Sequence, residues 1–415
     1  MKTRKLLLAA AAGMALAAAP LAFGIDADYG KLARGRYLVH AGDCAACHTD
    51  DGGQPFAGGR AIPTPFGTIY STNITPDKET GIGGWTDEQF YAAMHEGVRP
   101  NGQHLYPAFP YPWFTKLTRD DVLAIKAYLD SMRPVKQEAK PPGMPWPLTV
   151  RESVAGWNML FFKPGTFQPN AGKSPQWNRG AYLVEGLGHC GACHSPKNVL
   201  GGVKKKDRFE GGKGEGWFAT SLVGNDRAGL GSWSKEEIVE YLKTGANDRA
   251  RAMGPMAEVV HNSTMYLKHE DLEAIATYLK DLPAEAAIER NASLPSSDDD
   301  RMKRGRLVYV DQCAGCHMEN GQGVAHVFPA IKGNTGVHAQ DPTSLARLVL
   351  EGAPSAKTPA KPEGFAMPAF GWKLGNEDIA DVLTYIRASW GNKAAPVEAS
   401  KVADVRKQVA KMGSG

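Results

Sequence analysis

The six cysteines of this chain are the residues best suited to chemistry, and all of them fall in one repeated pattern. The pattern is Cys-x-x-Cys-His, at 44–48, 190–194 and 313–317. Two thiols three positions apart can each form a thioether to a vinyl group of haem, and the adjacent histidine can ligate the iron. A redox dithiol or half of a zinc site would explain a single copy. Three copies that use every cysteine favour covalent haem c.

The pattern predicts three covalently attached haem c groups and assigns their attachment residues. The thioether-forming residues are Cys44, Cys47, Cys190, Cys193, Cys313 and Cys316. The proximal iron ligands are His48, His194 and His317. A low-spin haem needs a second axial ligand, and in cytochromes c this is usually a methionine, which raises the reduction potential.

Two methionines stand where a distal ligand is expected. We call the stretch of chain around each motif a unit, and the ligand is expected between the second and third of the three helices predicted for that unit. Met367 precedes a proline, and Met256 follows one. We predict that both ligate iron, with Met253 as the fallback in the second unit. Core filling is the other role open to any single methionine.

The first unit departs from this arrangement. Phe109 lies 24 residues after Trp85, whereas Met256 lies 23 residues after Trp233, so a phenylalanine replaces the expected methionine. Phenylalanine cannot ligate iron. Met94 is our first choice for the distal ligand of haem 1, and His95 and His104 are lesser candidates. An open, five-coordinate iron is the other outcome.

Three helices are expected around each motif. The first helices, 31–40, 177–185 and 301–310, share an Arg-Gly pair, and a glycine inside a helix costs about 1 kcal/mol relative to alanine. A close helix–helix crossing would explain the recurrence. The second helices open near Thr86, Ser234 and Thr343 and stop at Gly97, Gly245 and Gly352. The third helices cover 118–132, 268–282 and 375–390, where apolar residues recur with helical spacing and the tyrosines are expected to pack in the core.

These elements predict a mainly α fold of three tandem class I cytochrome c domains, each a small helical bundle around a covalent haem c. The predicted segments are a signal peptide at 1–24, domain 1 at 25–133, a Pro/Gly-rich linker at 134–173, domain 2 at 174–287, an acidic linker at 288–300, domain 3 at 301–393 and a tail at 394–415. The leader has a basic start and an alanine-rich apolar run, typical of secretion signals, and an uncleaved membrane anchor is the other interpretation.

Composition limits the partners. The net charge of +4 over 415 residues gives no reason to expect nucleic acid. After the leader, no run of 18 apolar residues occurs, so we expect a soluble or peripherally attached protein. The apolar stretch 157–162 is expected to pack on a domain or a partner subunit. Residues 397–412 have two open outcomes, an amphipathic helix that contacts a membrane or partner, and a frayed tail.

The chain resembles the triheme cytochrome c subunits of bacterial membrane-bound dehydrogenases for alcohol, gluconate, sorbitol and fructose, and related subunits that accompany molybdenum hydroxylases. The resemblance rests on the segments 34–39, 102–111, 177–190 and 380–392. The alcohol dehydrogenase type carries methionine in the segment where Phe109 stands, so this position leans towards the molybdenum hydroxylase branch. The resemblance implies that electrons enter from a flavin, quinone or molybdenum catalytic subunit and leave to ubiquinone or a terminal oxidase.

We therefore expect an electron-transfer subunit of an oxidoreductase complex, in the periplasm at the inner membrane, and not catalytic alone. One alternative is a haem enzyme, such as a peroxidase, that uses an open haem 1. Another is a freestanding periplasmic shuttle. The substrate would be determined by another chain.

Overall fold

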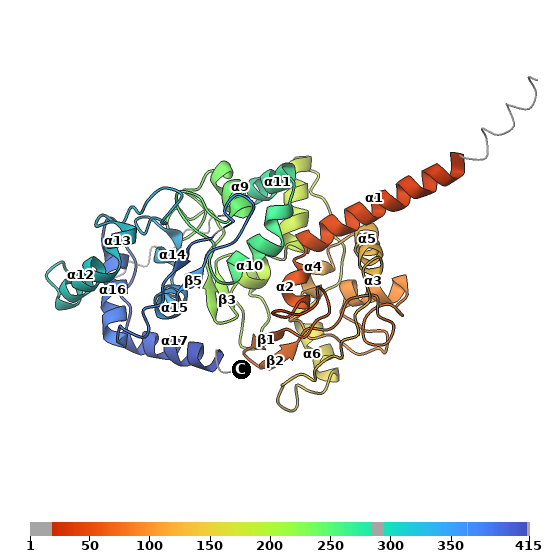
Figure 1. Cartoon of the computed structure of the whole chain (residues 1–415), viewed down its shortest axis with the longest axis horizontal. Coiled ribbons are helices and arrows are strands. Elements are labelled where there is room, and N and C mark those ends of the chain that lie inside the picture. The colour runs from red at the N-terminus through yellow and green to blue at the C-terminus, as the bar shows by residue number, and fades with distance from the viewer. Residues whose placement is uncertain (1–18, 284–293, 363, 413–415) are drawn as a thin grey trace, which may run out of the picture.

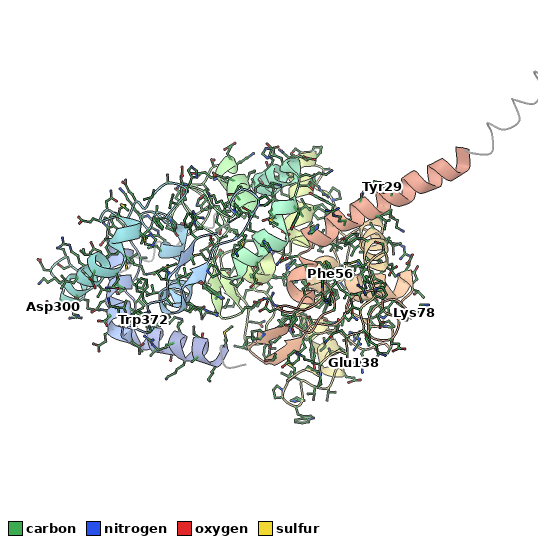
Figure 2. All side chains as sticks on the ribbon, in the orientation of Figure 1. Tyr29, Phe56, Lys78, Glu138, Asp300 and Trp372 are labelled. Carbon is green, nitrogen blue, oxygen red and sulfur yellow. The ribbon has the colours of Figure 1, made fainter. Side chains whose placement is uncertain are left out.

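The computed structural model describes residues 19–283, 294–362 and 364–412 (Figure 1). Residues 1–18 of the predicted signal peptide and 288–293 of the acidic linker lie outside them. The described chain forms three helical units, with units 1 and 2 side by side and unit 3 at the opposite end from helix α1 (Figure 1). Figure 2 shows Asp300 of unit 3 and Tyr29 of α1 far apart on the molecule.

Each unit is built on a pair of packed helices, its first and its third. The pairs are α1 (Ala19–Ala41) with α5 (Arg119–Asp130), α7 (Pro175–Tyr182) with α11 (His269–Lys280), and α12 (Asp300–Gln312) with α16 (Asn376–Ala388). A Cβ on Gly35 would lie 1.9 Å from the carbonyl oxygen of Ala124 in α5. The equivalent distances are 1.9 Å from Gly180 to Ala274 and 2.2 Å from Gly305 to Asp381. The predicted close crossing is confirmed in all three units.

The second helices begin and end close to the predicted residues. They are α3 (Asp87–Glu96), α9 (Lys235–Thr244) and α15 (Thr343–Glu351). Thr86 and Ser234 form capping boxes, and each helix ends at its predicted glycine. The third start differs, because Thr343 is the first helical residue rather than the cap, and its backbone N–H donates to the Asp341 carboxylate.

The turn from the first helix into each motif differs in length. The motif cysteine lies nine residues after the helix glycine in unit 1, ten in unit 2 and eight in unit 3. In unit 2 the chain passes through a π-helix, η1 (Leu183–Leu187), which is the usual way for a helix to accommodate one extra residue. In unit 1 the extra length forms a turn in which Asp43 has φ 53°.

Short elements complete the units. The motifs lie on α2 (Cys44–His48), α8 (Gly191–His194) and α13 (Ala314–His317). Three antiparallel hairpins follow, β1 (Ala61–Thr64) with β2 (Gly67–Tyr70), β3 (Gly212–Gly214) with β4 (Trp217–Ala219), and β5 (Ala353–Pro354) with β6 (Ala366–Met367). The remaining helices are α4 (Tyr111–Phe114), α6 (Glu152–Phe161), η2 (Lys205–Asp207), α10 (Pro255–Asn262), η3 (Thr264–Tyr266), α14 (Thr335–His338) and α17 (Ala399–Met412).

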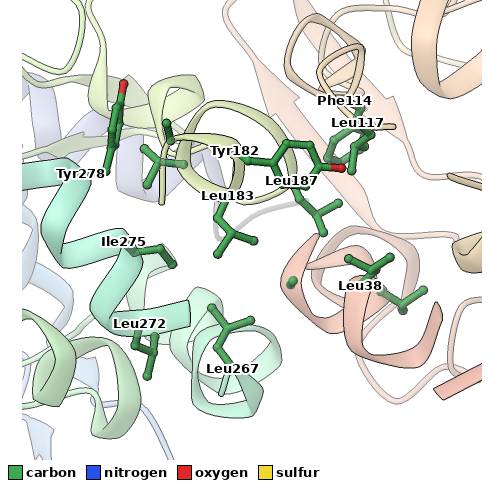
Figure 3. Packing of buried hydrophobic residues seen from close by; sticks show 14 of the residues in the cluster. Leu38, Phe114, Leu117, Tyr182, Leu183, Leu187, Leu267, Leu272, Ile275 and Tyr278 are labelled. Atoms are coloured by element: carbon green, nitrogen blue, oxygen red, sulfur yellow. The ribbon is translucent and has the colours of Figure 1, made fainter. Parts of the chain in front are cut away.

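Units 1 and 2 share one hydrophobic core. Figure 3 shows Leu38 of α1, Leu187 of η1 and Leu272 of α11 in the same cluster, and all three side chains are buried. Unit 3 has its own core, around α12, α15 and α16. The predicted domains 1 and 2 are therefore joined by their packing as well as by the 134–173 segment.

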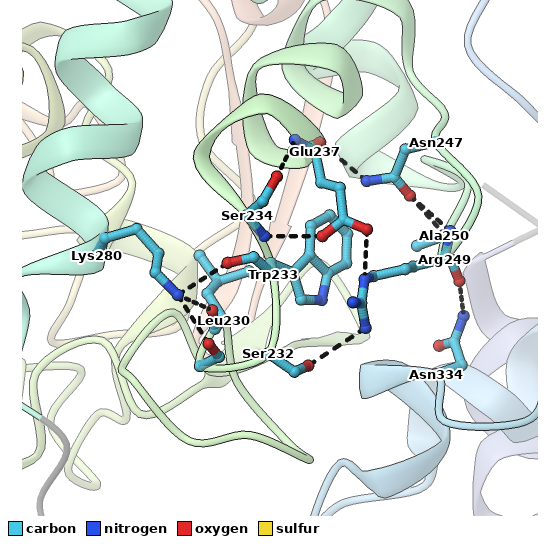
Figure 4. Close-up of polar contacts among 11 residues, drawn as sticks. Leu230, Ser232, Trp233, Ser234, Glu237, Asn247, Arg249, Ala250, Lys280 and Asn334 are labelled. Carbon is cyan, nitrogen blue, oxygen red and sulfur yellow. Dashed lines mark hydrogen bonds and ion pairs between the residues drawn. The ribbon is translucent and has the colours of Figure 1, made fainter.

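Unit 3 is joined to unit 2 mainly through loops and polar contacts. The Asn334 side chain donates to the carbonyl of Arg249, whose guanidinium pairs with Glu237 at 2.7 Å (Figure 4). Met253 forms an isolated antiparallel bridge with Ser355, next to the β5–β6 hairpin. A small apolar cluster that includes Val260 and Ala356 completes the junction.

The C-terminal segment forms the helix α17, and its apolar face is buried on unit 3. Val402 and Val405 are in the unit 3 core, and Arg406 donates to the carbonyls of Gly371 and Leu374. A frayed tail at 397–412 is therefore the wrong outcome. Among the described residues, no helix has the length and hydrophobicity that a membrane span needs.

Candidate haem sites

Each motif histidine is oriented by a backbone carbonyl. The Nδ1 atoms lie 2.6 Å from the oxygen of Thr72 for His48, 2.6 Å from that of Thr220 for His194, and 3.0 Å from that of Pro329 for His317. A carbonyl oxygen can only accept, so Nδ1 must carry the proton and donate it. The lone pair of Nε2 is then free for a metal, which is the arrangement that metal-ligating histidines adopt.

A second backbone hydrogen bond fixes each motif from the other side. The carbonyl of His48 accepts from the N–H of Gly58 at 2.8 Å. The carbonyls of His194 and His317 accept from Gly211 and Gly323, each at 3.0 Å. Each histidine is thus held both through its ring and through its own carbonyl. The sequence offered little signal for these partners, because their separations from the histidine differ between units.

The thiols of motif 1 and the first thiol of motif 2 are in an environment that is unsuited to dithiol redox chemistry. Burial raises the pKa of Cys44, Cys47 and Cys190 to about 12. A reactive thiol needs a lowered pKa, because the thiolate is the nucleophile. Burial also lowers the pKa of all three motif histidines, so their imidazoles stay neutral, as iron ligation requires. Motif 1 and Cys190 of motif 2 therefore fit covalent haem attachment better than a redox role.

The predicted distal methionines occupy corresponding parts of units 2 and 3. Met256 is in the first turn of α10 and packs against the cluster at the junction of units 2 and 3. Met367 is in β6 and packs against the unit 3 core. Met253, the fallback, has its backbone in the bridge with Ser355. The ligation assignments stay predictions.

In unit 1, Met94 is buried on the inner face of α3, and Phe109 packs against the same cluster. The two histidines nearby have other contacts. His95 stacks on Tyr91 with ring centroids 4.9 Å apart. The Nδ1 atom of His104 lies 3.4 Å from the side-chain amide of Asn158. Of these candidates, Met94 is the one whose side chain lies wholly within the hydrophobic interior.

Units 1 and 2 cover each other's motifs. Helix α4, which follows Phe109, places the indole nitrogen of Trp113 within 3.2 Å of the Cβ position of Gly191 in motif 2. In return, Arg60 donates to the carbonyl of Ala46 inside motif 1 and pairs with Glu258 of α10 at 2.7 Å. The segment between the second and third helices of each unit therefore lies against the haem motif of the other unit. In unit 1 this segment is α4, and in unit 2 it is α10, the helix that carries Met256.

A buried carboxyl lies at this contact. Asp43 directly precedes motif 1, and its Oδ1 atom has no hydrogen-bond partner among the described residues. Burial, reinforced by the negative charges of Glu258 and Glu215, raises the pKa of Asp43 well above its usual value, although Arg60 acts in the opposite direction. The charged form of the Asp43 carboxyl is therefore disfavoured in this structure. Sequence reasoning did not single it out.

Comparison with known proteins identifies the family of the chain. The cytochrome c family model matches residues 32–133 and 302–390. The gluconate 2-dehydrogenase cytochrome c subunit of Pantoea cypripedii is 43% identical over 395 residues, which cover 90% of this chain and 89% of the relative. This chain belongs to the family of cytochrome c subunits of dehydrogenase complexes.

Two further relatives define the breadth of the family. The cytochrome c subunit of the quinone alcohol dehydrogenase of Gluconacetobacter polyoxogenes is 41% identical over 97% of this chain and 90% of its own length. A nicotinate dehydrogenase subunit of Pseudomonas putida is 43% identical over 90% of this chain but only 32% of its own length. The chain thus resembles whole cytochrome subunits of some dehydrogenases and a part of a longer subunit of another.

The residues of each motif fit the cofactor of the family. Covalent haem c would supply a one-electron redox centre. At each motif the chain contributes two cysteine thiols for attachment and a neutral imidazole with Nε2 free. The carbonyl partners keep the imidazole plane fixed, which keeps a ligand in place when the charge of its metal changes.

Proposed function

We propose that this protein is a triheme electron-transfer subunit. It takes electrons from the catalytic subunit of a dehydrogenase in the periplasm and passes them to ubiquinone or a terminal oxidase at the inner membrane. The observation that carries the proposal is the threefold repetition of one histidine geometry, in which a carbonyl orients each motif imidazole at 2.6, 2.6 and 3.0 Å. The names of the relatives support a dehydrogenase partner.

The number of haems is tested directly. Holoprotein exported from a host with cytochrome c maturation should carry three haems per chain, by intact mass and by the pyridine haemochrome spectrum. Replacing Cys313 and Cys316 together by alanine should leave two. A wild-type protein with two haems or fewer would contradict the proposal.

The ligand assignments predict different spectra for three alanine variants. Met94→Ala, Met256→Ala and Met367→Ala should each remove one of three methionine–iron charge-transfer contributions in the oxidised protein and lower the potential of one haem. If Met94→Ala keeps all three contributions, haem 1 has another ligand. His95→Ala and His104→Ala, measured in the same way, then test the lesser candidates.

Electron transfer itself is tested on the complex with the dehydrogenase catalytic subunit that co-purifies with this protein. The purified complex should reduce all haems when the dehydrogenase substrate is added, and a ubiquinone analogue should then reoxidise them. Carbon monoxide tests the peroxidase alternative, because it binds a reduced haem that has an open position. Binding by the native protein would favour that alternative. Recovery of the protein only as a free monomer would favour a shuttle.

A further inference from the structure

Helix α6 is apolar on two faces, and only one of them is covered. Residues 153–162 contain no charged side chain. The inner face includes the buried Val154 and the half-buried Asn158, whose side chain accepts a hydrogen bond from the hydroxyl of Tyr111. On the outer face, Met159 is 84% exposed and Leu160 is 68% exposed. A helix that is hydrophobic all round is normally buried on all sides, so the outer face of α6 calls for a further contact.

The loops that adjoin α6 in sequence or by contact also carry exposed apolar residues. We define the α6 patch as Trp146, Val150, Met159, Leu160, Val199 and Leu200, all of them exposed. The indole N–H of Trp157 donates to the carbonyl of Leu200 at 2.9 Å, so the 195–203 loop is fixed against α6. Trp146 and Val150 lie in the turn that leads into the helix. The patch thus joins the 134–173 segment to unit 2.

The surroundings of the patch are basic. Residues 137–163 and 195–206 contain seven basic and two acidic residues, a net charge of +5 within a chain whose total is +4. Six of the basic residues are exposed lysines, Lys140, Lys163, Lys197, Lys204, Lys205 and Lys206. Helix α6 itself lies at the edge of the molecule beside the β1–β2 hairpin (Figure 1).

We propose that the α6 patch is the surface by which this protein lies on an anionic phospholipid membrane. Tryptophan and aliphatic side chains that project from a surface helix enter the headgroup region, and neighbouring lysines attract anionic lipids. The alternative site is helix α17, but its apolar face is buried in unit 3. The inference rests on the proposed function, because an electron acceptor at the inner membrane requires the protein to be near it.

The test is flotation of the holoprotein with lipid vesicles. Vesicles of phosphatidylethanolamine with phosphatidylglycerol should bind the wild-type protein, and higher ionic strength should weaken the binding. The double variant Met159→Ser/Leu160→Ser should lower the partition coefficient at least about tenfold, because two long apolar side chains no longer enter the lipid. Replacing Lys204, Lys205 and Lys206 together by glutamine should weaken binding to these vesicles but not to pure phosphatidylcholine.

Leu307→Ser is the matched control. Leu307 is 70% exposed on α12 of unit 3, outside the patch, and its replacement should leave vesicle binding unchanged. Unaltered haem spectra and thermal unfolding would show that the double variant is folded, and intact mass would show that all samples have the same N-terminus. Wild-type protein that does not float, or a double variant that floats like wild type, would overturn the proposal.

Two further results separate this proposal from others. If the double variant binds vesicles normally but no longer co-purifies with the catalytic subunit, the patch binds protein rather than lipid. If the patch binds lipid, reduction of the wild-type haems by the catalytic subunit in detergent solution does not depend on it. Its failure would contradict the proposed function, whereas loss of vesicle binding alone would leave electron transfer intact.

Discussion

Units 1 and 2 form a reciprocal pair, and unit 3 stands apart from them. The hydroxyl of Tyr37 in unit 1 donates to Asp271 of unit 2 at 2.5 Å. The hydroxyl of Tyr182 in unit 2 donates to Asp121 of unit 1 at 2.6 Å. Tyr37 and Tyr182 each lie two residues after the glycine of the helix crossing. The residue at the same position of unit 3 is Leu307, which is exposed. The same helix position thus faces a neighbouring unit in two cases and solvent in the third.

The comparison shows that the apolar surface of one repeated unit can be buried in two ways. The paired units cover each other, through a common core and through the contacts that each makes with the other's haem motif. Among the described residues, no other unit packs on α12 of unit 3 in this way, and the appended helix α17 fills the unit 3 core from another side. If each motif carries its haem, the first two haems are held by one shared hydrophobic core. The third haem is held by a separate core, so unit 3 can unfold independently of the pair.

The largest expected effect comes from the helix crossings. Gly35→Ala or Gly180→Ala should lower the free energy of unfolding by about 3 kcal/mol, because the new methyl group would meet a backbone oxygen 1.9 Å away. Either change should destabilise units 1 and 2 together, whereas Gly305→Ala should act on unit 3 alone. Thermal unfolding followed at the haem bands of the holoprotein measures both outcomes.

Gly30→Ala is the control for this experiment. Gly30 is also in α1, but apart from its chain neighbours and the backbone of its own helix, no described atom lies within 4 Å of its Cβ position. Alanine there should leave stability unchanged or raise it by up to about 1 kcal/mol. Equal destabilisation by Gly30→Ala and Gly35→Ala would contradict the steric explanation.

The next effect concerns the carboxylate that joins the pair. Asp271→Asn should cost about 2 kcal/mol, because Asp271 accepts two hydrogen bonds from Arg179 and one from Tyr37, and an amide cannot accept them all. The change should weaken the contact between units 1 and 2. Limited proteolysis would detect it as faster cleavage in the 134–173 segment, with unit 3 unaffected.

A smaller loss of stability is expected when the hydrogen bonds of Tyr37 and Tyr182 between units 1 and 2 are removed one at a time. Tyr37→Phe and Tyr182→Phe should each cost about 1 kcal/mol, since each removes one hydrogen bond to a carboxylate that keeps its arginine. Leu307→Ala, at the equivalent exposed position, should change stability by less than about 0.5 kcal/mol. Denaturant unfolding of the three variants compares them directly. Equal losses at all three positions would mean that the tyrosines do not join the units.

The smallest effect is an acid dependence of the pairing. Burial of Asp271 opposes its ionisation, but the hydrogen bonds from Arg179 and Tyr37 outweigh burial and lower its pKa. A carboxyl with a lowered pKa in the folded state stabilises the fold above its unfolded pKa of about 3.9, and this stability is lost as pH falls through the folded value. Unfolding temperatures of wild type and Asp271→Asn should therefore converge below about pH 4. Parallel curves would exclude this role for Asp271.

Local chemistry made much of the molecule predictable. The Cys-x-x-Cys-His spacing, the capping residues Thr86 and Ser234, and the Arg-Gly pairs each act within a few residues or one helix turn. Their consequences could therefore be inferred without a fold, and the structure has the helices and close crossings that they predict. The predicted cap at Thr343 was less accurate, because the helix begins at Thr343 itself and its backbone N–H donates to the Asp341 carboxylate.

The tertiary structure alone decided which surfaces meet. Thr72, Thr220 and Pro329 orient the histidines from distances of 24, 26 and 12 residues along the chain, so no spacing rule could find them. The joining of units 1 and 2, the burial of α17 and the exposure of α6 are also outcomes of packing. Apolar periodicity shows that a helix has a face to bury, but the partner for that face depends on the placement of every other element.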